Sequence, residues 1–161
     1  MIVILGTGGH ARAMMEKWRL SHWWPFAKFR MTNDDRDVPK NAQVVIGVGD
    51  VDDRRRLYKQ FRSQIGTGLQ IMPGAIVYAS ATLGVNVLVN TGAQIDHDCN
   101  IGDHCVIGPG AILCGGVRLG EACAIGAGAI ILQGVTLEAE TKVPAGTLVV
   151  AGDEWRYPVK R

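Results

Sequence analysis

A six-residue period runs through the second half of this 161-residue chain and restricts the shapes into which it can fold. Every sixth residue there is Ile, Leu or Val, a run that chance would produce less than about once in a million trials if a third of the region were these residues. A helix needs apolar spacing near 3.6 and a half-buried strand needs strict alternation, so neither fits. The period predicts short strands that each end at a tight corner. The positions are Ile65, Ile71, Val77, Leu83, Val89, Ile95, Ile101, Ile107, Leu113, Leu119, Ile125, Ile131, Leu137, Val143 and Val149.

Small residues occupy fixed places within each six-residue unit. One residue after the aliphatic position there is often a glycine, such as Gly102 or Gly108, and four residues after it the side chain is usually small, as in Ala93 or Ala111. A small side chain fits where the chain turns, and glycine accepts backbone angles that other residues resist. Three strands and three corners close a triangular coil of about 18 residues, and such coils stack into a β-solenoid. Counted from Ile65, the repeat predicts five coils.

The same six-residue register predicts the surroundings of the four cysteines. Cys99, Cys105 and Cys123 fall on the small-residue position and are expected to pack at buried corners, whereas Cys114 lies off that register and is expected to be more exposed. No C-x-x-C pair is present, so neither a zinc knuckle nor a redox motif is predicted. Disulfides are not expected in a protein of the cytosol.

Residues 1–64 carry a different pattern, that of a small α/β unit that binds a nucleotide. Ile2–Leu5 is a short apolar strand, and Gly6-Thr-Gly-Gly-His-Ala11 matches G-x-G-x-x-[G/A] before a helical stretch. In that context the amides of Gly8, Gly9 and their neighbours at the helix start bind a pyrophosphate. Because 64 residues make only one mononucleotide half, NAD and FAD are disfavoured and a nucleotide-linked sugar is favoured.

Further elements of this Rossmann-like unit can be placed along the sequence. Phe26–Met31 and Gln43–Val48 are predicted strands, and a helix capped by Asp50 or Asp52 is predicted to reach about residue 62. Acidic residues after the second strand are placed to bond a ribose hydroxyl. The candidates for that role are Asp34 and Asp35, and Trp23-Trp24 are expected to cover the sheet.

Composition narrows the functional classes. Seventeen Lys and Arg against fifteen Asp and Glu give a net charge of +2, which is too even for a dedicated nucleic-acid binder or a basic membrane patch. A hydrophobic fraction of 47% argues against disorder. Apolar runs fall far short of the ~20 residues that cross a bilayer, and Met1–Leu5 is too short for a signal-peptide core. A soluble cytoplasmic protein is expected, with no nucleic-acid or membrane partner.

The G-x-G-G-H loop, the small α/β unit and the hexapeptide solenoid together resemble the bacterial hexapeptide-repeat sugar acetyltransferases, the family of sialic acid O-acetyltransferases and UDP-4-amino-sugar N-acetyltransferases. Val45–Gly49, Asp52–Arg55 and Asn90–Cys99 also resemble motifs of that family. The resemblance implies a nucleotide-sugar domain over 1–64 and a left-handed parallel β-helix over 65–161 that ends in a C-terminal tail. It further implies a homotrimer, with acetyl-CoA as co-substrate in the groove between subunits.

The family resemblance also implies the catalytic residues. Acetyl transfer to an amine or hydroxyl needs a base, and imidazole, with a pKa near ~6.5, is largely neutral at pH 7. His97 matches the catalytic histidine of the family, and Asp98 matches its acidic neighbour. Neighbouring residues on an extended strand point to opposite faces, so a direct bond between His97 and Asp98 requires a bend.

Binding residues are implied in the same way. His10 matches a loop histidine near the acceptor sugar, beside Gly8 and Gly9. Val106 stands where the family often has a second histidine that contacts the acetyl donor, so either His104 substitutes or a backbone amide serves. The expected cofactor contacts are Val106, Gly115, Gly116, Gly126, Ala127 and Gly128.

Several functions remain open at this point. The expected reaction is acetylation of the amino group of a nucleotide-linked sugar, by direct transfer in a ternary complex, and the alternative is O-acetylation, because one base serves both acceptors. A metal enzyme of the carbonic-anhydrase kind is disfavoured because it needs three imidazoles per zinc, and the solenoid sequence has only His97 and His104. No metal is expected. A non-catalytic scaffold that binds a nucleotide sugar is the remote alternative.

Overall fold

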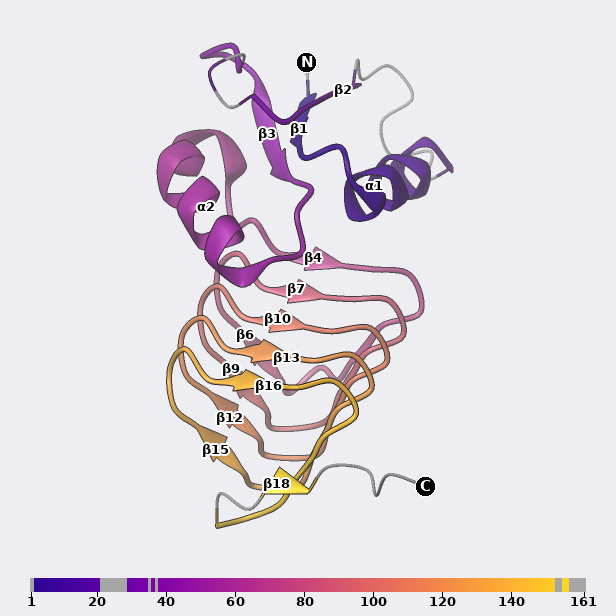
Figure 1. Cartoon of the computed structure of the whole chain (residues 1–161), viewed down its shortest axis with the longest axis vertical. Helices are drawn as coiled ribbons and strands as arrows, with labels where there is room; N and C mark the ends of the chain where they lie inside the picture. The colour runs from indigo at the N-terminus through magenta and orange to yellow at the C-terminus, as the bar shows by residue number, and fades with distance from the viewer. Residues whose placement is uncertain (1, 21–28, 35, 37, 153–154, 157–161) are drawn as a thin grey trace. The chain divides into compact units, whose positions relative to one another are not determined.

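The chain divides into two compact units in the computed structural model, Met1–Gly68 and Leu69–Arg161 (Figure 1). The residues described are 2–20, 29–34, 36, 38–152 and 155–156. The roles predicted for Asp35 and for Trp23-Trp24 lie outside these residues, as does most of the C-terminal tail. No helix within the described residues is long and apolar enough to span a membrane.

The N-terminal unit is a three-stranded parallel sheet with two helices. Its elements are β1 (Ile2–Leu5), α1 (Gly9–Leu20), β2 (Phe29–Thr32), β3 (Gln43–Ile46) and α2 (Val51–Ile65). The sheet order is β2-β1-β3, so the chain leaves β1 toward one side and returns to its other side. In open parallel sheets, ligands bind at the carboxyl ends of the strands where this reversal occurs. The three predicted strands are found. The second ends at Thr32 rather than Met31, and the start predicted for it at residues 26–28 lies outside the described residues. The third ends at Ile46 rather than Val48.

Two glycines allow the carboxyl ends of β1 and β3 to approach closely. Gly6 has φ of 119°, and a Cβ there would lie 2.8 Å from the carbonyl oxygen of Gly47. A Cβ on Gly47 would lie 2.7 Å from Cβ of Ala11 in α1. The first glycine of the G-x-G motif is therefore required by packing, because any side chain would meet backbone.

The second helix begins where an acidic cap was predicted. Asp50, rather than Asp52, is the N-cap, and its carboxylate accepts bonds of 3.0 Å from the amides of Asp52 and Asp53. The apolar side of α2 buries Leu57 and Phe61, as expected for an amphipathic helix. The helix continues through Ile65, beyond the predicted end.

The C-terminal unit is a parallel β-solenoid, as the six-residue period predicts. Its two-residue strands form three sheets, β4-β7-β10-β13-β16, β5-β8-β11-β14-β17 and β6-β9-β12-β15, with β18 antiparallel beside β17. Strands in register lie 18 residues apart, as in the pair Ile107 and Ile125. The left hand of the coil stays a prediction. The strands are Gln70–Ile71 (β4), Ile76–Val77 (β5), Thr82–Leu83 (β6), Leu88–Val89 (β7), Gln94–Ile95 (β8), Asn100–Ile101 (β9), Val106–Ile107 (β10), Ile112–Leu113 (β11), Arg118–Leu119 (β12), Ala124–Ile125 (β13), Ile130–Ile131 (β14), Thr136–Leu137 (β15), Lys142–Val143 (β16), Leu148–Val149 (β17) and Trp155–Arg156 (β18).

The solenoid has fewer coils than the five predicted from the sequence. One of its sheets has four strands, so the chain completes four turns and part of another. The count of five was wrong because Ile65, the first position of the series, is the last residue of α2 rather than part of a coil. From Ile71 onward, every aliphatic position of the series is the second residue of a strand.

The core of the solenoid contains the aliphatic positions and the small corner residues. Ile95, Ile107 and Leu113 are completely buried. Cys99, Cys105 and Cys123 are also buried, and their thiols donate to backbone carbonyls at 3.1 to 3.2 Å. The register therefore correctly predicted that these three cysteines are buried, and burial raises the pKa of the Cys99 thiol.

Candidate active site

His97 and Asp98 form a hydrogen-bonded pair at a solenoid corner, directly after β8. His97 Nδ1 lies 2.8 Å from Asp98 Oδ2. The required bend is present, because Asp98 adopts a left-handed conformation with φ of 59°, which Asp tolerates better than most residues. The amide of Asp98 donates to Oγ of Ser80 at 3.1 Å, and this bond ties the corner to the preceding coil.

The electrostatic surroundings favour a basic imidazole. The hydrogen bond that His97 donates to Asp98 is the largest cause that raises the pKa of His97 above its ordinary value, and the negative charge of Asp96 is the next. In turn, the bond to His97 lowers the pKa of Asp98. Both side chains are exposed, by 53% for His97 and 70% for Asp98. With Nδ1 bound to a carboxylate, the imidazole presents Nε2 for proton exchange with a substrate.

Gly115 lies directly beside the imidazole ring. A Cβ on Gly115 would lie 2.6 Å from both Cε1 and Nε2 of His97, so any other residue there would force the ring out of this position. The amide of Gly116 donates to the carbonyl oxygen of His97 at 2.9 Å. The sequence assigned both glycines to cofactor contacts and missed that Gly115 makes space for His97. The 18-residue spacing from His97 to Gly115, one coil, is the signal that indicates this contact.

The other expected cofactor positions lie elsewhere on the solenoid. Ala127 and Gly128 are exposed at the corner before β14. Gly126 is packed against the next coil, where an added Cβ would contact the backbone of Pro144 and Ala145. Val106, the first residue of β10, is 8% exposed.

His104 is a buried corner residue. Its side chain is 6% exposed and its Nδ1 lies 3.0 Å from Nδ2 of Asn86, one coil earlier. The Asn86 amide donates, so Nδ1 accepts and the ring proton belongs on Nε2. This burial leaves His104 little surface with which to contact a co-substrate.

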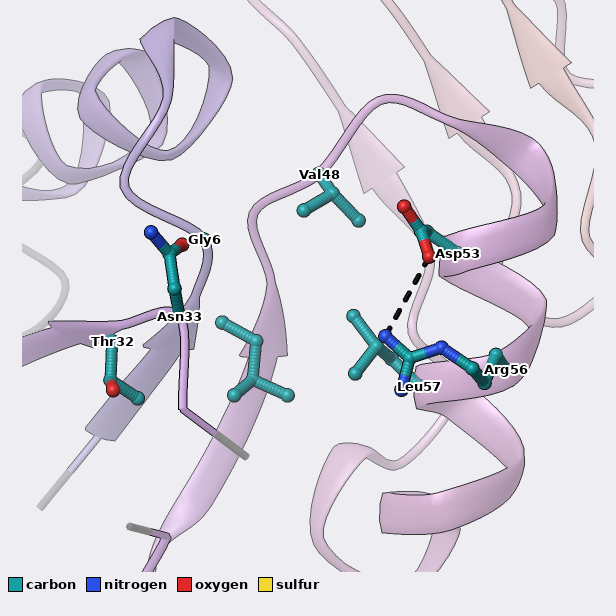
Figure 2. Close-up of a pocket in the computed structure, with 8 residues that line it drawn as sticks. Gly6, Thr32, Asn33, Val48, Asp53, Arg56 and Leu57 are labelled. Atoms are coloured by element: carbon teal, nitrogen blue, oxygen red, sulfur yellow. Dashed lines mark ion pairs between the residues drawn. The ribbon is translucent and has the colours of Figure 1, made fainter. Parts of the chain in front are cut away.

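A pocket lies at the carboxyl edge of the sheet in the N-terminal unit (Figure 2). Its volume is about 140 Å³. The ends of all three strands and the first turns of α2 supply its walls. The lining residues are Leu5, Gly6, Thr32, Asn33, Val48, Asp53, Arg56 and Leu57. The Arg56 guanidinium lies 3.6 Å from the Asp53 carboxylate, as the dashed line in Figure 2 marks.

Of the glycine loop, Gly6 lines the pocket, whereas Gly8 and Gly9 do not. An added Cβ on Gly8 or Gly9 would have no atom within 4 Å, so the start of α1 is open to an approaching group. His10 is half-buried. Asn33 Nδ2 donates to Oγ1 of Thr7 at 2.7 Å and so ties β2 to the loop. The sequence missed Asn33, although the rule that ligands bind at strand carboxyl ends would have indicated it.

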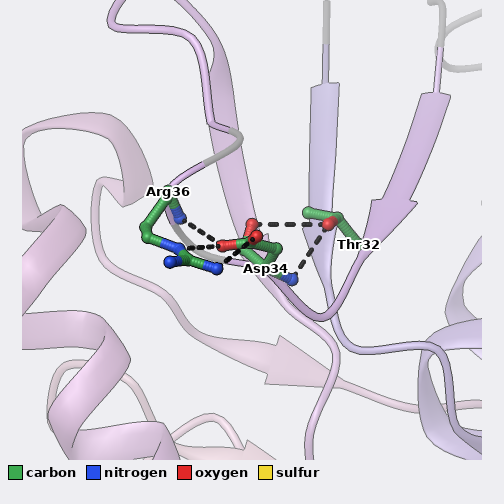
Figure 3. Close-up of polar contacts among 3 residues, drawn as sticks. All are labelled: Thr32, Asp34 and Arg36. Atoms are coloured by element: carbon green, nitrogen blue, oxygen red, sulfur yellow. Dashed lines mark hydrogen bonds and ion pairs between the residues drawn. The ribbon is translucent and has the colours of Figure 1, made fainter.

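Asp34 is engaged by a neighbouring arginine (Figure 3). Nε and Nη2 of Arg36 donate to the two carboxylate oxygens of Asp34 at 2.9 and 3.0 Å, and these bonds lower the pKa of the carboxyl. The amide of Asp34 donates to Oγ1 of Thr32 at 3.0 Å. Arg36 would therefore have to release Asp34 before this carboxylate could bind a ribose hydroxyl.

Metal ligands were not expected from the sequence. Within the part of the chain that the structure describes, there is no group of three or more His, Cys, Asp or Glu side chains placed to hold a metal ion. The site at His97 is instead a carboxylate and an imidazole beside a glycine.

Comparisons with known proteins place this architecture among acetyltransferases. A family model described as the hexapeptide repeat of succinyl-transferase matches residues 99–133 and 116–151. The chain is similar to the acetyltransferase domain of PglB from Neisseria gonorrhoeae FA1090, with 25% identity over 98% of this chain and 93% of that chain and a TM-score of 0.82. No match was found among curated proteins.

Two further solved structures share the fold. One is a histidine-to-asparagine mutant of perosamine N-acetyltransferase from Caulobacter crescentus in complex with CoA and GDP-perosamine, with 25% identity, 98% and 97% coverage and a TM-score of 0.72. The other is WeeI from Acinetobacter baumannii AYE, with 20% identity, 97% and 98% coverage and a TM-score of 0.67. These likenesses extend over nearly the whole chain.

Proposed function

We propose that this chain, a hexapeptide-repeat sugar acetyltransferase, transfers acetyl from acetyl-CoA to the amino group of a nucleotide-linked amino sugar. The observation that carries the proposal is the exposed His97 imidazole held by Asp98 at 2.8 Å. The structural neighbours, one of them an N-acetyltransferase solved with CoA and a nucleotide sugar, support the substrates. A cytoplasmic location belongs to the same proposal.

His97 acts as the general base in this reaction. The acceptor amine attacks the thioester carbonyl carbon, a C–N bond forms and the C–S bond breaks. The amine proton passes to Nε2 of His97, which then returns it to the leaving thiolate. Asp98 holds the ring through Nδ1 and stabilises the imidazolium that forms, so it is a positioning residue.

Acetyl-CoA is held by small residues of the solenoid. Gly115 and Gly116 lie at the corner of His97, whereas Ala127 and Gly128 lie at the corner before β14. Small residues let a pantetheine chain approach backbone groups. The family resemblance implies that the co-substrate lies in the groove between subunits, and we include a homotrimer in the proposal.

The outer face of one sheet suits such an assembly. On the sheet that contains β5 and β14, Ile76 is 51% exposed and Tyr78 beside it is 55% exposed, while Ile130 is 36% exposed and Leu132 beside it is 38% exposed. Exposed apolar side chains that cluster on one face mark interaction sites. Equivalent outward positions on the sheet of β6 and β15 are polar, such as Thr82 and Thr136.

Ile130→Arg is expected to convert the trimer to monomers, because the charge would have to be buried between subunits. Light scattering coupled to gel filtration measures this change. Thr136→Arg, on the polar sheet, is the matched control and should remain trimeric. A wild-type chain that elutes as a monomer would refute the assembly, and a trimeric Ile130→Arg variant would place the interface on another face.

A thiol-release assay tests the reaction itself. Acetyl-CoA is supplied with UDP-, GDP- and CMP-linked amino sugars and with free sugars, and the released CoA thiol is followed. Acetylation of a nucleotide-linked amine is the expected result. Transfer only to the hydroxyl of a free sugar would instead establish the O-acetyltransferase, and binding of a nucleotide sugar without thiol release from any acceptor would establish a scaffold.

Asp98→Asn is expected to move the acidic limb of the pH–rate profile to lower pH. The Asp98 bond raises the pKa of His97, so its loss lets the imidazole deprotonate at lower pH. The maximal rate should also fall, because an amide no longer fixes the ring tautomer. Measurement of kcat/KM from pH 5 to 9 checks both effects. An unchanged limb would show that Asp98 does not act on His97.

A further inference from the structure

Two matched ion pairs lie side by side on α2, and only one of them faces the pocket. Asp52 and Arg55 are 3.9 Å apart, and Asp53 and Arg56 are 3.6 Å apart, each with i,i+3 spacing. Exposed pairs of this kind contribute little to stability. Both pairs would stabilise the helix equally. Helix stability therefore does not explain why the Asp53–Arg56 pair lines a pocket (Figure 2).

The pocket has the size and walls for one aromatic ring. Its volume of about 140 Å³ is close to the ~150 Å³ cavity that accepts benzene in an apolar protein core. Leu5, Val48 and Leu57 supply apolar surface, whereas Asn33 and the Asp53–Arg56 pair supply polar groups. Apolar side chains combined with converging polar groups suit a planar heterocycle whose edge is read by hydrogen bonds.

The pocket suits the base of a nucleotide better than its phosphates. The amides at the start of α2 are already bonded to the Asp50 carboxylate, so they do not offer an anion site. The negative charge of the Asp53 carboxylate would also repel a phosphate bound in the pocket. A nucleotide bound in this unit would therefore place its base here and its phosphates toward the open start of α1 at Gly8 and Gly9.

We infer that Asp53 and Arg56 select a lactam base, uracil or guanine, over cytosine and adenine; this rests on the proposed function. The guanidinium of Arg56 donates to a ring carbonyl oxygen, and the carboxylate of Asp53 accepts from the adjacent ring N–H. Uracil and guanine present that carbonyl and N–H side by side. Cytosine and adenine present an amino group beside an unprotonated ring nitrogen, which places a lone pair against the carboxylate and a donor against Arg56.

Titration calorimetry with UDP, GDP, CDP and ADP tests this selectivity on the full chain. The wild-type protein is expected to bind UDP and GDP at least about tenfold more tightly than CDP and ADP. Asp53→Asn should reduce that preference to a few-fold, since a carboxamide can both donate and accept. Arg56→Gln should weaken UDP and GDP binding by about tenfold. The matched variants Asp52→Asn and Arg55→Gln should bind all four nucleotides as the wild type does.

Each contrary outcome has a separate meaning. Equal wild-type binding of the four nucleotides, or no binding of any, overturns the base selection, as does an Asp53→Asn variant with the same preference as Asp52→Asn. Acetyl-CoA binding, measured in the same instrument, distinguishes failure of the base selection from failure of the proposed function. If the protein binds acetyl-CoA but shows no base preference, the proposed acetyltransferase function stands and the base selection is refuted. If the protein selects UDP and GDP but transfers no acetyl group, the base selection stands and the proposed acetyltransferase function is refuted.

Discussion

His97→Ala is expected to lower kcat for acetyl transfer by about 10²- to 10⁴-fold, the range that a positioned general base contributes. The acceptor amine would then lose its proton to water rather than to an imidazole whose pKa Asp98 and Asp96 raise. The affinity for the nucleotide acceptor should not change, because the pocket assigned to the nucleotide lies wholly in the N-terminal unit. Thiol release under saturating substrates measures the loss, and calorimetry measures acceptor binding.

His97→Asn provides the second variant for this experiment. Asparagine retains a polar side chain of moderate size at an exposed corner but cannot act as a base near neutral pH. Both variants should unfold at the wild-type temperature, since the His97 side chain is half exposed. Added imidazole should restore part of the activity of His97→Ala. If both variants transfer acetyl at the wild-type rate, His97 is not the base.

The sequence predicted the solenoid well because each coil repeats the same packing. A single aliphatic position every six residues is enough to define strand, corner and stacking partner, and from Ile71 onward each one ends a strand. The exception, Ile65, satisfies two patterns at once. It follows Phe61, a buried residue of α2, by four residues, which is also the spacing of a helix face. Periodicity alone could not assign it.

The candidate site was predicted less completely, for two physical reasons. Alternation along a strand places neighbours on opposite faces, and only the left-handed backbone at Asp98 lets it reach His97. The pocket of the N-terminal unit draws Gly6, Asn33 and Asp53 from three separate segments. The glycine motif indicated the right edge of the sheet, but it directed attention to Asp34, which Arg36 binds, instead of to Asn33.

Gly115 offers a sharper test of the His97 geometry than removal of the imidazole. The equivalent residue one coil later, 18 residues along the chain, is Gln133, which is exposed. The backbone at this place in the coil therefore accepts a side chain. Glycine is needed at 115 because the ring of His97 occupies the space that a Cβ would fill, 2.6 Å from Nε2.

Gly115→Ala is therefore expected to reduce kcat by about 10²-fold, the cost of displacing a catalytic group by roughly 1 Å. The fold should persist, because the half-exposed ring can swing outward away from the new methyl group. Gln133→Ala is the matched control and should be fully active. In the His97→Ala background, Gly115→Ala should have no further effect on kcat, since both changes act through one imidazole. Additive losses in the double variant would show that Gly115 affects kcat independently of His97.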